Sequence, residues 1–408
     1  MGNLALNGGS PVRTAPFPSW PVWDERELES VKSAIESGKW GYPNWEFVPR
    51  FEEQFAAFHD AGFSICFNSG TTALMAALWA VGVQPGDEVI LPAYTFIATA
   101  TAAVQLGAIP VFADIEKTSF HINAYSVEEK ISPKTAAVIA VHIGGRPADL
   151  SRLSNICRHR NIKLIEDAAQ AWGSEWRNKR VGALGDAGIF SFQSSKNITA
   201  GEGGIVLTND EETASYCRSF CNCGRIEGKP RYDHYYIGGN YRMSEIQAAM
   251  LQAQFERYPE LIRKRQMNAE YLNNELASIP FIFPVNESED VSSNSYHLFL
   301  MRYKEEYCEN APKSRIVEAM RSEGIPLSPG YTVPVYRQPV FLNGAFGPKG
   351  KPLSGFPDYN SISLPETELA CASEGLWLTQ NVLLGSEEDM RDIITGFEKL
   401  SDHAKELA

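Results

Sequence analysis

The chain has 408 residues, of which 44% are hydrophobic and 21% are charged, so it has enough apolar material for a large buried core. Its 37 Lys and Arg residues stand against 50 Asp and Glu residues, which gives a formal net charge of −13. Nucleic acids and anionic membrane surfaces attract positively charged proteins, so this charge argues against both kinds of partner. No apolar run approaches the roughly 18 residues that span a bilayer, and the first residues do not resemble a signal peptide. We therefore expect a cytoplasmic protein.

The seven cysteines argue against a disulfide framework, because their number is odd and low for the length. Three of them, Cys217, Cys221 and Cys223, lie close together in the sequence. Soft-metal sites pair such a cluster with a second group of ligands further along the chain, and none follows here. We expect reduced thiols near the end of a helix and no metal, and the role of the cluster stays open.

Short apolar runs alternate with amphipathic stretches over the first two-thirds of the chain. Near-continuous apolar strands separated by helices are typical of a mostly parallel sheet that is covered on both faces. The fold class predicted for this part is therefore α/β. In chain order, the pattern predicts a strand at 63–68, a helix at 71–82, a strand at 88–93, a helix at 96–107, strands at 109–114 and 136–143, a helix at 149–161 and a strand at 162–167.

The pattern changes after about residue 243. We predict a large α/β domain over residues 1–260, which includes the N-terminal arm, and a smaller α+β domain over residues 261–408. The boundary is expected inside a long helix. The elements predicted after the change are two helical stretches at 243–255 and 259–276, a strand near 296–303, a helix near 313–322, a loop rich in Pro and Gly, and a C-terminal helix from about Ser386.

Three polar segments each follow a predicted strand, at the edge of a parallel sheet where ligands bind. The first, Asn68–Thr72, leads from a strand into a helix. Its backbone N–H groups, its hydroxyls and Gly70 suit an anion such as a phosphate. Simple capping of the helix by Ser69 or Thr71 is the alternative interpretation.

The second segment holds Asp167, which ends a buried apolar run. A carboxylate there needs a charged or hydrogen-bonding partner, and a protonated pyridine nitrogen would be one, although helix capping is again the alternative. The third segment holds Lys196 in a turn rich in Ser and Gly. Partial burial of such a lysine lowers its pKa and makes it an amine nucleophile, whereas most single lysines are merely solvated. In the order phosphate turn, acid and lysine, the three segments predict a pyridoxal-phosphate site.

Several motifs support this interpretation as a set: NSGTTAL, PAYTFIATA, DIEKTSFHIN, EDAAQAWGS, SFQSSKNITAGEGG and GGNYRMSEIQAAML. With them the chain resembles the DegT/StrS family of pyridoxal-phosphate aminotransferases of fold type I over almost its whole length. The combination of LALNGGSPVR with SFQSSKNITAGEGG is most similar to the branch that holds glutamine:scyllo-inosose aminotransferases and 3-amino-5-hydroxybenzoate synthases. The resemblance implies a large domain with a mostly parallel seven-stranded sheet and a smaller C-terminal α+β domain.

The resemblance also implies roles for individual residues. Lys196 would be the catalytic lysine that forms a Schiff base with pyridoxal 5′-phosphate, and Asp167 would be the catalytic partner of the pyridine nitrogen. Arg242 and His297 match positions near the substrate, but Arg242 can equally form a structural ion pair and His297 can be an ordinary buried histidine. The remaining cofactor-binding residues would be Gly70, Thr71 and Ser191 at the phosphate, Phe96 on the ring face, Gln170 at the phenolic edge, and Asn240 at the phosphate of the neighbouring subunit, which implies a homodimer with shared active sites.

The implied reaction is a ping-pong transamination that moves an amino group from L-glutamine or L-glutamate to a keto-sugar or a ketocyclitol such as scyllo-inosose. A pyridoxal-phosphate dehydratase and aromatase like 3-amino-5-hydroxybenzoate synthase is the main alternative, because it would use the same lysine and aspartate. A non-catalytic regulator that merely binds the cofactor would need a DNA-binding or partner domain, and the chain has no basic helix-turn-helix extension. The identity of the keto substrate is left open.

Overall fold

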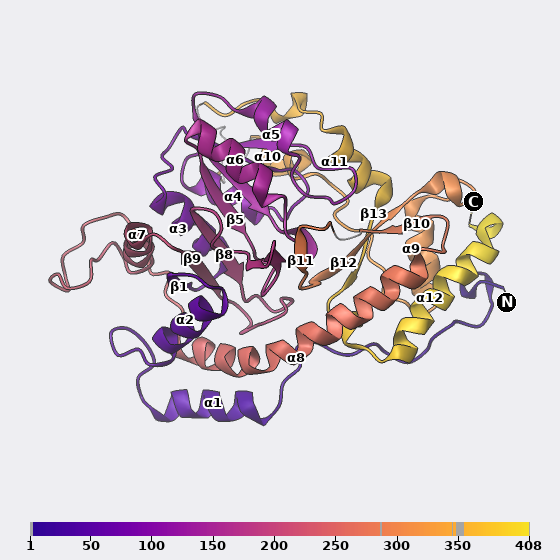
Figure 1. The fold of residues 1–408 in the computed structure, drawn as a ribbon, viewed down its shortest axis with the longest axis horizontal. Helices are drawn as coiled ribbons and strands as arrows, with labels where there is room; N and C mark the ends of the chain where they lie inside the picture. The colour runs from indigo at the N-terminus through magenta and orange to yellow at the C-terminus, as the bar shows by residue number, and fades with distance from the viewer. Residues whose placement is uncertain (1–2, 286–287, 345, 348–354, 408) are drawn as a thin grey trace.

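The computed structural model describes residues 3–285, 288–344, 346–347 and 355–407. The largest sheet has seven strands in the order β1-β9-β8-β5-β4-β2-β3. Strands β1, β9, β8 and β5 of this sheet are labelled in Figure 1. All neighbours pair in parallel except at β9, which is antiparallel to β1 and β8. The predicted mostly parallel sheet is thus confirmed. Its strands are β1 (Phe63–Phe67), β2 (Glu88–Pro92), β3 (Ile109–Ala113), β4 (Thr135–Val141), β5 (Lys163–Asp167), β8 (Ala187–Ser191) and β9 (Gly204–Thr208).

Helices cover both faces of this sheet, and the side chains of each strand alternate between them. Ile65 and Phe67 of β1 pack in the core on one face, whereas Cys66 between them packs in the core on the other. The strands are apolar at nearly every position because both of their faces are buried. The helices of this part are α1 (Glu25–Glu36), α2 (Phe47–Phe58), α3 (Gly70–Ala80), α4 (Ala98–Gln105), α5 (Ala124–Lys130), α6 (Leu150–Arg160) and α7 (Glu211–Cys221).

The C-terminal part builds a smaller core around a three-stranded antiparallel sheet of β10, β12 and β13. Leu4 from the N-terminal arm packs in this core, and the two chain ends both lie beside α12 in Figure 1. A third small sheet joins the two parts, because β11 pairs with β6. The elements are β6 (Glu175–Trp176), β7 (Lys179–Arg180), β10 (Ile282–Pro284), β11 (Val291–Ser293), β12 (Leu298–Tyr303), α9 (Lys313–Ser322), α10 (Pro339–Leu342), α11 (Pro365–Leu369), β13 (Gly375–Thr379) and α12 (Glu387–Asp402).

One long helix, α8 (Glu245–Leu276), replaces the two separate stretches predicted from the sequence. Proline lacks a backbone N–H and normally bends or ends a helix, but α8 continues through Pro259. Packing explains the difference. Leu251, before the proline, lies in the core against the large sheet, whereas Leu272, beyond it, lies in the C-terminal core. The predicted boundary at residue 260 therefore falls inside α8, and the division into two domains stays a prediction. Among the described residues, no helix is both long and apolar enough to cross a membrane.

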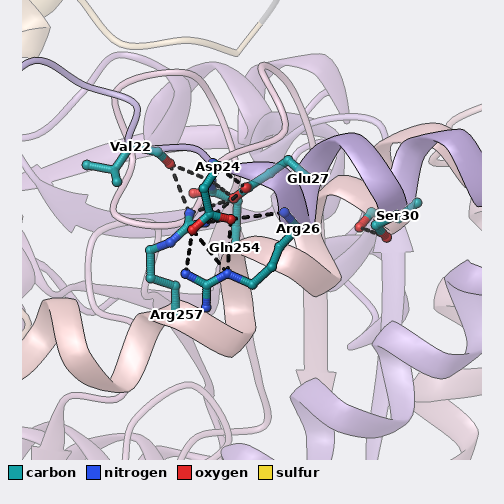
Figure 2. A network of polar contacts seen from close by, with 8 residues as sticks. Val22, Asp24, Arg26, Glu27, Ser30, Gln254 and Arg257 are labelled. Atoms are coloured by element: carbon teal, nitrogen blue, oxygen red, sulfur yellow. Dashed lines mark hydrogen bonds and ion pairs between the residues drawn. The ribbon is translucent and has the colours of Figure 1, made fainter.

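A buried polar network ties α1 to α8 (Figure 2). The Arg257 guanidinium donates to the two Glu27 carboxylate oxygens at 2.6 and 2.9 Å, and Gln254 Nε2 donates to Glu27 Oε1 at 2.6 Å. Gln254 and Arg257 also donate to the backbone oxygen of Val22. Removing Arg257 would leave the buried Glu27 carboxylate without an ion-pair partner, which typically costs about 3–5 kcal/mol. The network therefore fixes α1 and the segment before it, which includes Trp20.

Candidate active site

A cavity of about 760 Å³ opens where the central strands end. Its opposite wall comes from the C-terminal part and includes Tyr331, Trp377 and Gln380. His297 lines the cavity too, whereas Asn240 and Arg242 lie outside its lining. The structure thus brings together seven of the eight predicted catalytic and cofactor-binding residues: Gly70, Thr71, Phe96, Asp167, Gln170, Ser191 and Lys196.

One end of the cavity is an anion cradle formed by the start of α3. The helix begins at Gly70, and the N-cap Ser69 accepts a hydrogen bond from the Thr72 N–H at 3.2 Å. The first N–H groups of a helix have no acceptor within the helix, and they attract negative charge. A Cβ at Gly70 would lie 2.8 Å from the Ser191 Cβ, so only glycine fits between the helix and the end of β8. Capping by Ser69 and a phosphate-sized anion site are therefore compatible.

Asp167, the last residue of β5, is buried and lines the cavity. The Thr99 hydroxyl donates to its Oδ2 at 2.9 Å, and the Ala169 N–H donates to its Oδ1 at 3.2 Å. A further hydroxyl, that of Thr95, lies 3.0 Å from the Thr99 hydroxyl. Burial raises the pKa of Asp167, and the Thr99 hydrogen bond and the charge of Lys196 oppose this rise. A cation that entered the cavity beside Asp167 would be stabilised by this carboxylate.

Lys196 follows β8 in a tight turn, in which its N–H donates to the Gln193 carbonyl at 2.9 Å. Its side chain lies in the cavity lining and is partly accessible from the cavity. Burial lowers the pKa of Lys196 to about 8, while the charge of Asp167 opposes the shift. With this pKa about one molecule in ten carries a neutral amine at pH 7, against roughly one in 3,000 for an ordinary lysine. The residue is therefore suited to act as a nucleophile and a base.

Aromatic and amide groups complete the central part of the cavity. Phe96 is 59% exposed although it lies in the lining, so one of its faces is free to cover a flat ligand. Gln170 Oε1 accepts a hydrogen bond from the Gly144 N–H at 2.6 Å, and Tyr331 lines the same cavity. The Tyr331 ring packs edge-on against Trp377, with 5.1 Å between the ring centroids.

His297 has a defined protonation state. Its Nδ1 lies 2.9 Å from Asn197 Oδ1, and Asn197 Nδ2 donates to the Ser295 carbonyl at 2.9 Å. Because Asn197 Oδ1 can only accept, the proton of the His297 ring is on Nδ1. Burial, together with the charges of Lys196 and Arg265, holds the pKa of His297 well below its ordinary value. The neutral ring therefore offers Nε2 as an acceptor.

Asn240 and Arg242 lie near the three clustered cysteines instead of in the cavity. Arg242 Nη1 donates to Asn222 Oδ1 at 2.8 Å and lies 3.8 Å from Cys223 Sγ, so its contacts here are structural but not ionic. Asn240 is exposed and forms an isolated β-bridge with Asn222. Among the described residues, no group of three or more His, Cys, Asp or Glu side chains is placed to hold a metal ion.

Glu166, next to Asp167, stabilises the structure around the site. Its carboxylate accepts hydrogen bonds from the Gly182, Leu184 and Gly185 N–H groups and from His142 Nε2, at 2.6 to 3.1 Å. Burial alone would raise the pKa of Glu166, but these donors, His142 first, bring it below its ordinary value. The Asp167 carbonyl in turn accepts from the His142 N–H at 3.0 Å. The end of β5 is therefore held in place on both sides.

Sequence reasoning missed several residues of the site. Thr95 lies three residues after the end of β2, so a search for polar residues beyond strand ends would also have selected it, whereas Thr99 lies one turn further on, in α4. No local sequence pattern marks Trp20, Trp377 and Gln380, because the tertiary fold brings them to the cavity from distant parts of the chain.

The residues present fit pyridoxal 5′-phosphate. The α3 cradle suits its phosphate, and Gly70 leaves no room there for a side chain. Asp167 is a buried carboxylate that can partner a protonated ring nitrogen, and Lys196 is an amine with a lowered pKa. Phe96 offers an exposed ring to the same cavity.

Comparisons with known proteins agree with this fit. Residues 21–369 match the model of the DegT/DnrJ/EryC1/StrS aminotransferase family. The chain is 34% identical over 425 residues to the L-glutamine:2-deoxy-scyllo-inosose aminotransferase of Micromonospora echinospora, with 100% of each chain covered. It is 35% identical over 384 residues to the 3-amino-5-hydroxybenzoate synthase of Amycolatopsis mediterranei, with 93% of this chain and 96% of that protein covered. The crystal structure of a 3-amino-5-hydroxybenzoic acid synthase superposes with a TM-score of 0.84 at 34% identity, over 97% of this chain and 100% of that one.

Proposed function

Since the chain belongs to the DegT/DnrJ/EryC1/StrS aminotransferase family, we propose that it transfers an amino group from L-glutamine or L-glutamate to a keto-sugar or a ketocyclitol related to scyllo-inosose. It is a pyridoxal-phosphate-dependent aminotransferase of fold type I. The observation that carries the proposal is the shared cavity of Lys196, Asp167 and the anion cradle at Gly70. The choice of a ketocyclitol is supported by the names of the relatives that match the whole chain.

The side chains of the cavity have different roles in the proposed reaction. When bound, pyridoxal 5′-phosphate supplies an aldehyde that takes up an amino group and a ring that stabilises negative charge on the donor's α-carbon. Lys196 would hold the cofactor and, as a neutral amine, would carry the proton from that carbon to the aldehyde carbon of the cofactor. Asp167 keeps a positive charge on the ring nitrogen. Gly70, Thr71 and Ser191 hold the phosphate.

The proposal extends to a homodimer with shared active sites. The loop 225–240 after α7 projects from the body of the chain at the left of Figure 1, and its Tyr232 and Ile237 are 80% and 90% exposed. Large apolar side chains gathered on one exposed segment often mark a protein interface. Asn240 at the end of this loop is also exposed, as a residue that reaches a neighbouring phosphate has to be. Analytical ultracentrifugation is expected to show a dimer, and a fully active monomer would contradict this.

A cytoplasmic location is part of the same proposal. All seven cysteines are unpaired, and six of them are buried, as is usual for proteins of a reducing compartment. Fractionation of cells that produce the protein would test this, and enrichment in an oxidising compartment would contradict it.

Two half-reactions test the main proposal. Protein loaded with the cofactor is mixed with L-glutamine or L-glutamate, and we expect the visible absorbance of the cofactor to fall as it accepts the amino group. Scyllo-inosose, 2-deoxy-scyllo-inosose or a nucleotide-linked keto-hexose is then added, and we expect the absorbance to return together with an aminated product in the mass spectrum. If both donors leave the absorbance unchanged, the amino transfer is wrong. If every ketone fails to restore it, the substrate class is wrong.

A dehydratase and aromatase is the second candidate, because the synthase from Amycolatopsis mediterranei covers nearly the whole chain. The same assay separates the two candidates. An ultraviolet-absorbing aromatic product would favour the synthase, and a saturated amino-cyclitol would favour the aminotransferase.

A further inference from the structure

Arg265 is a buried cation without a carboxylate partner. The residue lies on α8 and is 0% exposed, and the structure shows no ion pair to it from any described residue. Its Nε and Nη2 donate to Gln380 Oε1 at 3.1 and 2.5 Å, whereas Nη1 has no hydrogen-bond partner. Burial lowers the pKa of Arg265 to about 10, so the group is still charged at neutral pH. A buried charge that is neither neutralised nor paired is costly and calls for an explanation.

The charge of Arg265 lies directly behind one wall of the cavity. Gln380, which binds the guanidinium, is a lining residue. The Trp20 ring, also in the lining, has its centroid 5.3 Å from the Arg265 Cζ. His297 in the lining feels the same charge, which lowers its pKa. Because the interior screens charges weakly, an anion at this wall would be attracted strongly.

Hydrogen bonding also sets the orientation of the Gln380 amide. Since Oε1 accepts both bonds from Arg265, the Nε2 group on the other side of the amide is directed away from the guanidinium. No described residue accepts a hydrogen bond from Nε2. The atom is nevertheless not fully buried, since it is absent from the fully buried polar atoms that lack a partner. Gln380 is 2% exposed and lines the cavity, so we place this atom at the cavity surface. The wall presents a hydrogen-bond donor backed by a positive charge.

We propose that Arg265 and Gln380 form the binding site for the α-carboxylate of the amino-acid donor. Gln380 donates the hydrogen bond, and Arg265 is a positioning residue that orients this amide and supplies the positive charge. The site is distinct from the anion cradle of Gly70, because it comes from α8 and the end of β13 on the opposite wall. This inference rests on the proposed use of L-glutamine or L-glutamate as the donor.

The variant Gln380→Glu tests the proposal, because it keeps the shape of the side chain and gives Arg265 an internal counter-ion. The folded state is expected to be at least as stable as the wild type in a thermal melt. In the half-reaction, the Kd for L-glutamine should rise about 30- to 100-fold, which is the loss of one hydrogen bond to a charged group. The reaction of 4-aminobutanamide, which is glutamine without its α-carboxylate, should change less than about threefold, since it makes no contact that depends on the charge.

A binding measurement separates the anion site from the chemistry. Calorimetry with 4-carbamoylbutanoate, which is glutamine without its amino group, is expected to show binding to the cofactor-loaded wild type and a similar loss in Gln380→Glu. Arg265→Met removes the charge at nearly constant volume, and its affinity for this probe should fall about tenfold or more. Gln338→Glu is the matched control, because it adds the same charge in the C-terminal part but outside the cavity lining.

The outcomes are distinct. Equal affinity of wild type and Gln380→Glu for 4-carbamoylbutanoate, or no binding to the wild type, would overturn the carboxylate site. If the wild type binds the probe and Gln380→Glu does not, but neither L-glutamine nor L-glutamate reacts, the site stands and the proposed donor reaction fails.

Discussion

The two walls of the cavity are built in different ways. The sheet wall holds Gly70, Asp167 and Lys196 at or just after strand ends, where backbone hydrogen bonds and buried donors fix each position. The C-terminal wall holds Trp377 and Gln380, which come from β13 and the residue after it. In the proposed binding mode the first wall would face the cofactor, and the second would face the substrates. A family can therefore keep one chemistry and change its substrates by altering the second wall.

This comparison predicts that changes in the sheet wall impair the reaction with every substrate, whereas the effect of changes in the C-terminal wall depends on the groups that the substrate carries. Lys196→Ala should have the largest effect, because it removes the amine that holds the cofactor and moves the proton. Turnover should fall by at least about 10⁴-fold, and the visible absorbance of the bound cofactor should disappear. Lys179→Ala, at an exposed position on β7, is the control and should behave as wild type. A Lys196→Ala protein that keeps both turnover and absorbance would disprove the assignment.

Asp167→Asn should lower kcat by about 10²- to 10³-fold while the cofactor stays bound, because the amide cannot hold a positive charge on the ring nitrogen. Steady-state kinetics with both L-glutamine and L-glutamate measure this, and the two donors should be affected equally. Asp60→Asn is a suitable control, since Asp60 is exposed and its φ of 52° is one that asparagine accepts. A loss confined to one donor would mean that Asp167 belongs to substrate recognition.

The pH dependence of cofactor uptake depends on Lys196. Its pKa of about 8 lies below the ordinary value, so the neutral amine becomes abundant as the pH rises towards 8 instead of 10.5. The rate of covalent uptake by cofactor-free protein should increase about 50-fold from pH 6 to pH 8 and then level off. Stopped-flow absorbance measures this rate. A rise that continues unchanged to pH 10 would show that Lys196 is an ordinary solvated lysine.

Gly70→Ala should weaken the binding of the cofactor about 10-fold, because the added Cβ would lie 2.8 Å from the Ser191 Cβ and push the cradle apart. Equilibrium dialysis gives the Kd of the cofactor. Gly41→Ala, where the structure has nothing within 4 Å of the new Cβ, should leave the Kd unchanged. If the two variants bind the cofactor equally well, the phosphate lies elsewhere.

Thr99→Val should have the smallest effect, a decrease of about 5- to 10-fold in kcat, because Asp167 keeps its other donor when it loses the Thr99 hydroxyl. Thr101→Val, on the same helix but outside the cavity lining, is the matched control. Equal kcat values for the two variants would show that the Thr99 hydrogen bond has no part in catalysis.

The residues of the sheet wall could be predicted from the sequence for a physical reason. A buried strand is recognisable from its apolar run, and the polar residue that follows it necessarily lies at the sheet edge, as Asp167 does. The sheet, the strands and helices predicted between residues 63 and 167, and the C-terminal helix after Ser386 are confirmed, whereas α1, α2 and α5 were not predicted. Whether Asn240 reaches a neighbouring phosphate stays a prediction.

The C-terminal wall was not predictable in this way, because sequence position does not show which distant residues meet. Gln380 and Arg265 are 115 residues apart, and each looks ordinary in its own segment. The continuity of α8 was missed for a related reason. Pro259 favours a break locally, but burial of Leu251 and Leu272 in two cores outweighs that preference.

The unbroken α8 has a consequence for the dimensions of the catalytic chamber. With 32 residues it is a rod about 48 Å long. Its first half packs in the core against the large sheet and its second half carries the Arg265 guanidinium, so this one helix sets the spacing between the sheet wall and the wall at Gln380. Deleting a single residue from this helix would rotate the residues that follow by about 100° around the helix axis. The C-terminal wall would then no longer be aligned with the sheet wall.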